Sequence, residues 1–104
     1  MKHFYTYGTK ESTFENLKED ISQIFNVELQ EHESGLWGIY AMGETPQIKE
    51  VKLYPNFVEG EGFHEDEGGY SYLLAISYPE NPSDIPGLVG STQNKFQLIR
   101  HNEL

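Results

Sequence analysis

The first regular pattern along the chain is a stripe of apolar residues spaced three and four apart, which is typical of an amphipathic helix. The stripe consists of Phe14, Leu17, Ile21, Ile24 and Phe25. Ser12 and Glu15 stand three positions apart near its start, which is the spacing of a capping box. Asn26 follows the last apolar residue and suits a helix end. The pattern therefore predicts a helix over residues 13–25 with one buried face.

After this helix the apolar residues alternate with other residues, which is the period of β-strands. The predicted strands cover 27–30, 37–42, 51–54, 70–78 and 95–100, with an opening strand over 3–7. Clusters of Gly, Pro, Asn and Ser separate them. The connections between the first four of these strands after the helix are too short for a crossover helix, so we expect antiparallel pairing. Residues 73–76 are all apolar, which places their strand in the middle of the sheet.

Together these elements predict an α+β fold in a single domain, 1–104, with the N-terminal helix packed on one face of a meandering antiparallel sheet. A second short helix is expected near 83–92, where Ser83 and Asp84 can cap a helical turn. Tyr70, Tyr72 and Tyr78 are expected to share one side of their strand. Such aromatic rows usually contribute packing, although tyrosine is also enriched at protein interfaces.

The net charge of the chain says more about its function than about its fold. The 104 residues include 17 acidic and 7 basic side chains, so the net charge is -10. Nucleic acid and anionic membranes are disfavoured as partners, because binding them requires Lys and Arg, whereas a cationic protein is attracted. The absence of cysteine excludes disulfides, thiolate nucleophiles and Cys-based zinc sites. No apolar export signal or membrane-length apolar run is visible, so we expect a cytoplasmic protein.

The densest charge lies in the acidic segment, residues 59–69, which reads EGEGFHEDEGG. Its spacing does not match an EF-hand loop, and no HExxH, G-x-S-x-G or phosphate-loop motif occurs in the chain. His3 and His101 are terminal, and His32 stands between two glutamates whose side chains point away from it in a strand. We therefore expect no cofactor, no bound metal and no enzymatic activity, and interpret the acidic segment as either a solubilising loop or a surface for a basic partner.

A partner-binding surface needs desolvated anchors as well as charge. The candidate residues combine the acidic segment, a second acidic cluster and nearby aromatics. They are Glu59, Glu61, Glu65, Asp66 and Glu67; Glu31 and Glu33; and Phe63, Tyr70 and Tyr72. Trp37 and Phe57 are further aromatic residues, but each of them taken singly is expected in the core.

The chain resembles small acidic bacterial immunity proteins that accompany contact-dependent growth-inhibition or polymorphic toxins. The resemblance runs from Phe14 to Arg100 and rests on EHESGLWGIY at 31–40, VKLYPN at 51–56, the acidic segment, and FQLIR at 96–100. The residues that match the family pattern are Glu33, Ser34, Gly38, Tyr40 and Asn56. The resemblance implies a cytoplasmic, non-catalytic protein that covers the active site of one cognate basic toxin domain, often a nuclease.

Three other readings compete with this one. A phosphate-mimicking inhibitor of a nucleic-acid enzyme, of the anti-restriction type, would spread acids along an extended face at about 7 Å spacing. A small metal-dependent hydrolase would require His64 to converge with nearby carboxylates. A scaffold domain would have no charged partner at all. A second copy of the chain covering the open face of the sheet, as in a homodimer, is also compatible with the pattern.

Overall fold

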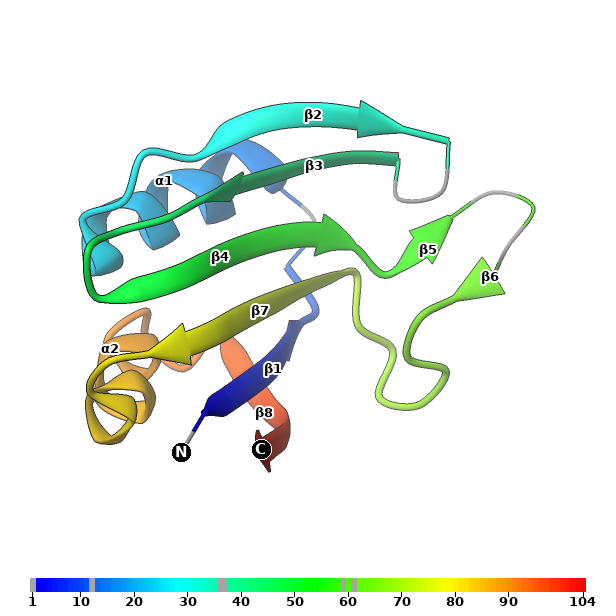
Figure 1. Cartoon of the computed structure of the whole chain (residues 1–104). Helices are drawn as coiled ribbons and strands as arrows, with labels where there is room; N and C mark the ends of the chain where they lie inside the picture. Colours follow the sequence, from blue (N-terminus) through cyan, green and yellow to red (C-terminus); the bar gives the residue numbers. More distant parts are fainter. Residues whose placement is uncertain (1, 12, 36–37, 59, 61) are drawn as a thin grey trace.

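The computed structural model describes residues 2–11, 13–35, 38–58, 60 and 62–104. Figure 1 shows a twisted sheet with helices packed behind it and a small hairpin projecting from one end. The elements are β1 (His3–Thr9), α1 (Phe14–Phe25), β2 (Gln30–Ser34), β3 (Gly38–Gly43), β4 (Ile48–Pro55), β5 (Phe57–Val58), β6 (Gly62–Phe63), β7 (Tyr72–Pro79), the 3-10 helix η1 (Pro82–Asp84), α2 (Ile85–Gly90) and β8 (Phe96–Glu103). The fold is of the α+β class, as predicted.

The main sheet has six strands in the order β2-β3-β4-β7-β1-β8, and every neighbouring pair is antiparallel. Four of these strands form the predicted meander. The opening strand β1 then lies between β7 and β8, so the first and last strands of the chain are neighbours (Figure 1). The central position of β7, predicted from its apolar run, is confirmed because β4 and β1 flank it. The hairpin β5–β6 forms a separate two-stranded sheet.

The N-terminal helix is confirmed almost to the residue. Leu17, Ile21 and Phe25 are buried on the face toward the sheet, as their spacing requires. Asn26 ends the helix in the left-handed conformation, with φ of 51°. Thr13 is the N-cap and makes no side-chain capping bond, while the predicted cap Ser12 lies outside the described residues.

One layer of helices and one sheet enclose the main core. α1 and α2 contribute buried residues to it, among them Ile21 and Val89, and both pack on the same face of the sheet. The second helix was predicted near 83–92 and is found as η1 followed by α2, ending at Gly90. On β7, Leu74 and Ile76 point into this core, whereas Leu73 and Ala75 belong to a smaller cluster on the opposite face.

The predicted strand over 27–30 is wrong. Residues 27–29 form the connection from α1, in which Val27 is buried and Leu29 packs against the core. The strand is β2, which begins at Gln30 and consists of polar, mostly exposed residues. It lies at the edge of the sheet and, within the part of the chain that the structure describes, pairs with β3 alone, so it has no buried face there to produce an alternating pattern. The alternation of Val27 and Leu29 instead belongs to a connecting segment that packs over the end of the core.

The expectation that Tyr70, Tyr72 and Tyr78 share one side of a strand is also wrong. β7 begins at Tyr72, which packs against the main core, whereas Tyr70 precedes the strand and packs against the opposite cluster. Tyr78 has φ of 55°, which breaks the alternation before the strand ends. The glycines at 68 and 69 both have positive φ, so the backbone that leads to Tyr70 is not extended.

Tyr7 offers a test of the core in which stability should rise. It is 4% exposed, and its hydroxyl has no hydrogen-bond partner among the described residues. A buried polar group without a partner costs about 1–3 kcal/mol, so Tyr7→Phe should raise the free energy of unfolding by about 1 kcal/mol. Urea titration measures the change. Tyr5→Phe is the matched control, because the Tyr5 hydroxyl donates to the carbonyl of Pro82, and that variant should lose stability. A loss for both variants would contradict the prediction.

Candidate partner-binding surface

A buried asparagine organises the segment that contains most of the predicted site. Asn56, between β4 and β5, is 1% exposed. Its Nδ2 donates to the carbonyl oxygens of Glu65 and Tyr70, each at 2.9 Å, and its Oδ1 accepts the Glu65 N–H at 2.8 Å. Its backbone N–H donates to the carbonyl of Ser71 and its carbonyl accepts the N–H of His64, both at 2.9 Å. These five bonds fix both sides of the bend that carries residues 66–69.

The hairpin β5–β6 presents two aromatic rings to solvent. Phe57 pairs with Phe63 across the hairpin, and their ring centroids are 5.0 Å apart. Their exposed fractions are 54% and 53%, while Val58, the second residue of β5, is buried. Phe57 is therefore not a core residue, contrary to the expectation from its type. Strand alternation alone places it outward, but two-residue strands give too short a pattern to read from the sequence.

These rings line an open groove at the same end of the molecule. Its volume is about 500 Å³, and its walls are Pro55, Phe57, Phe63, Gly69, Tyr70, Ser71 and Tyr72. Tyr70 and Tyr72 pack against opposite faces of the sheet, yet both reach this groove. The structure thus brings together three of the predicted aromatic anchors, Phe63, Tyr70 and Tyr72, and adds Phe57 to them.

The acids of the acidic segment do not all face solvent. Asp66 and Glu67 are exposed. Glu65 instead turns back toward the sheet and forms an ion pair with Arg100 of β8, which leaves its side chain 20% exposed. A partner's cation would compete with Arg100 for that carboxylate. Glu59 and Glu61 were also predicted to bind a partner, and they lie outside the described residues.

Tyr54 is buried beneath the acidic segment, on the face of the sheet away from the helices. His64 contacts its ring edge-on, with centroids 5.4 Å apart. Burial raises the pKa of the Tyr54 phenol, the charge of Glu65 raises it further, and Arg100 opposes them. Lys52 lies over the rings of Tyr54 and Tyr40, at 5.7 and 5.3 Å. The acidic segment and these contacts cover part of the sheet face opposite the helices. This is the face on which the sequence allowed a second copy of the chain to pack.

The second acidic cluster lies on β2, toward the end of the sheet from which β5–β6 projects (Figure 1). Glu31 is paired with Lys18 of α1 at 2.5 Å, and Lys18 is shared with Glu15 at 3.3 Å. Glu33 is exposed and stands opposite Ile39 of β3, which is 54% exposed. Ile39 was not predicted as a site residue, and it adds apolar surface near the groove, since its neighbour Gly38 approaches Pro55.

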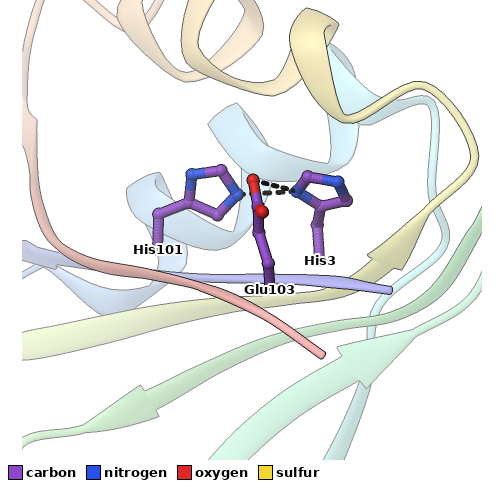
Figure 2. A group of neighbouring side chains, drawn as sticks. All are labelled: His3, His101 and Glu103. Atoms are coloured by element: carbon purple, nitrogen blue, oxygen red, sulfur yellow. Dashed lines mark hydrogen bonds and ion pairs between the residues drawn. The ribbon is translucent and has the colours of Figure 1, made fainter. Parts of the chain in front are cut away.

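Potential metal ligands gather elsewhere. Among the described residues, one group of His, Asp and Glu side chains is close enough to share an ion, and it consists of His3, His101 and Glu103 (Figure 2). His64 is not part of it. His3 and His101 lie near the two ends of the chain, and nothing local in the sequence shows that the strands carrying them are neighbours.

Comparison with known proteins adds no assignment: no family profile, curated protein or solved structure matches the chain. Within the described residues, no helix is both long and apolar enough to cross a membrane.

Proposed function

We propose that this chain is an immunity protein, which binds a basic toxin domain through the groove and the acids beside it and covers the toxin's active site. The observation that carries the proposal is the exposed pair Phe57 and Phe63, with the exposed acids Asp66 and Glu67 following Phe63 closely in the sequence. Exposed aromatic rings in a groove are the residues that anchor protein interfaces. Carboxylates around them would attract Lys and Arg of a nuclease and stand in for the phosphates of its substrate.

The overall charge supports the same partner. A chain with a net charge of -10 associates faster with cationic proteins and repels nucleic acid. The phosphate-mimic alternative is less well supported, because the carboxylates of Glu65 and Glu31 are already paired with Arg100 and Lys18. As an immunity protein the chain acts in the cytoplasm of the toxin-producing cell, and its work requires binding alone.

The proposal is tested with basic protein domains encoded by the genes that neighbour the one for this chain, each taken in turn as a candidate toxin. The toxin domain is expressed in a bacterium with and without the chain, and growth is followed. The purified pair is then analysed by size exclusion at low salt and at about 0.5 M salt, where exposed charges are largely screened. Growth rescue and a complex that survives the salt support the proposal. Growth arrest despite expression of the folded chain, or binding to many basic proteins that salt abolishes, contradicts it.

Within that complex, Phe57→Ala and Phe63→Ala should each weaken binding about 30-fold, because truncating a central anchor costs about 2 kcal/mol or more. Isothermal titration calorimetry of the toxin domain measures the loss. Leu104→Ala is the matched control, since Leu104 is 72% exposed and pairs with Lys2, at the end of β1 opposite to Thr9, which pairs with the groove residue Tyr72. If the control loses as much affinity as the Phe variants, the binding surface has been misplaced, although the immunity function can still stand.

A further inference from the structure

The pairing of β1 with β8 brings particular side chains to one spot. The backbones of Lys2 and Leu104 exchange both of their hydrogen bonds, at 3.2 and 2.7 Å. The next pair along, His3 with Glu103, is therefore a non-hydrogen-bonded pair, in which facing side chains come closest together. Residues two positions further on point to the same side. This register gives a compact cross-strand cluster rather than residues that meet by chance on loops.

The third member of the cluster is held by packing. His101 pairs directly with Tyr5, and their rings stack with centroids 4.1 Å apart. Tyr5 itself is 4% exposed and is anchored by its hydroxyl bond to the carbonyl of Pro82, at 3.0 Å. The stacked ring fixes the direction of the His101 imidazole, which reaches diagonally to His3. The His3 Nδ1 and His101 Nε2 atoms are 2.8 Å apart.

The donor atoms converge on one point (Figure 2). One nitrogen from each imidazole and one oxygen of Glu103 all lie within 4.8 Å of one another. The distance from His3 Nδ1 to Glu103 Oε1 is 3.8 Å. A tetrahedral zinc with bonds of about 2.0–2.1 Å separates its ligand atoms by roughly 3.3 Å. The observed 2.8 and 3.8 Å lie on either side of that value, so small side-chain rotations suffice.

The chemistry of the cluster also suits a metal. Two imidazole nitrogens at a hydrogen-bonding distance of 2.8 Å require one ring to present a lone pair toward the other, and a lone pair is what a metal ligand needs. Two imidazoles and a carboxylate are a donor set that zinc accepts. We propose that His3, His101 and Glu103 form a three-ligand Zn²⁺ site, with water in the fourth position. The bound ion would join two strands whose residues are 98 positions apart in the chain.

The test is a zinc titration of the full chain without an affinity tag, followed by isothermal calorimetry. We expect one Zn²⁺ per chain, and a melting temperature raised on the order of 10 °C at about 100 times the dissociation constant, since the unfolded chain lacks the site. Co²⁺ in place of Zn²⁺ should give the visible absorption of a tetrahedral site. His3→Ala and His101→Ala should each lower the affinity at least about 10-fold, and Glu103→Gln should lower it less.

His32→Ala is the control, because His32 is exposed on β2 at the far edge of the sheet, stacked on Tyr40. It should bind zinc as the unaltered chain does, and circular dichroism should show that all variants are folded. Absence of zinc binding to the unaltered chain at roughly 1 mM overturns the proposal. So does binding that persists in the His3→Ala, His101→Ala double variant. Neither result bears on toxin binding, which involves the opposite end of the sheet.

Discussion

Asn56→Ala is expected to lower the free energy of unfolding by about 3 kcal/mol, because it removes three side-chain hydrogen bonds at a buried position and leaves their partners unpaired. The freed groups are the N–H of Glu65 and the carbonyls of Glu65 and Tyr70. The acidic segment then loses its side-chain attachment to the end of β4. Hydrogen exchange of residues 62–71 should quicken more than that of β7, whose ladder does not depend on Asn56.

Urea titration measures the stability change, and two variants sharpen it. Asn102→Ala, on the exposed strand β8, should stay within about 0.5 kcal/mol of the unaltered chain. Asn56→Asp keeps the shape but turns the donor toward two carbonyls into a buried acceptor, so it should be at least as harmful as alanine. If Asn56→Ala is as mild as Asn102→Ala, the segment is held by contacts other than this side chain.

Gly43→Ala is expected to cost about 2–3 kcal/mol, since overpacking against atoms that cannot turn aside forces the backbone to move. A Cβ at Gly43 would collide with the backbone carbonyl of Glu28, in the connection from α1 to β2, and would lie 3.0 Å from a methyl group of Val27. That connection seals the core, so its displacement should expose Val27 as well.

Thermal unfolding followed by circular dichroism measures the effect. Gly87→Ala is the matched control, because a Cβ there meets nothing within 4 Å and the residue lies in α2. A helical glycine replaced by alanine should gain about 0.5–1 kcal/mol. The two variants thus make the same Gly→Ala change, but Gly43→Ala should lower the free energy of unfolding whereas Gly87→Ala should raise it. Stabilisation by both would mean that the approach of residues 27–29 to β3 is looser than the structure has it.

The sequence predicts those helices and strands in which the spacing of apolar residues follows from the burial of one or both faces. α1 shows a full stripe because one face packs on the sheet, and β7 is apolar on both faces because it is central. β2 could not be predicted, since an edge strand without a buried face has no period, and its limits depend on pairing with β3. Nor does any local signal say that β1 lies between β7 and β8.

Some residues of the candidate site could likewise be predicted from the sequence, whereas others depend on the fold. Charge density alone pointed to Asp66 and Glu67, which are exposed. It could not reveal that Glu65 is paired with Arg100, a residue 35 positions later, because that contact depends on the fold. The sequence indicated Asn56 only as part of a turn and of the family pattern, and its burial explains why an amide is needed there. The exposure of Phe57 and the meeting of His3 with His101 likewise exist only in three dimensions.

The place of β1 in the sheet also governs the order in which the protein can assemble. β2, β3, β4 and β7 can pair in succession as the chain is synthesised, each with the preceding strand of the main sheet. β8 has β1 as its neighbour in the sheet, so the strand made last must find the one made first. Pairings of such long sequence separation slow folding toward milliseconds or longer. Until β8 pairs with β1, the backbone N–H and C=O groups along that edge of β1 are exposed. The high negative charge then helps incompletely folded chains to repel one another.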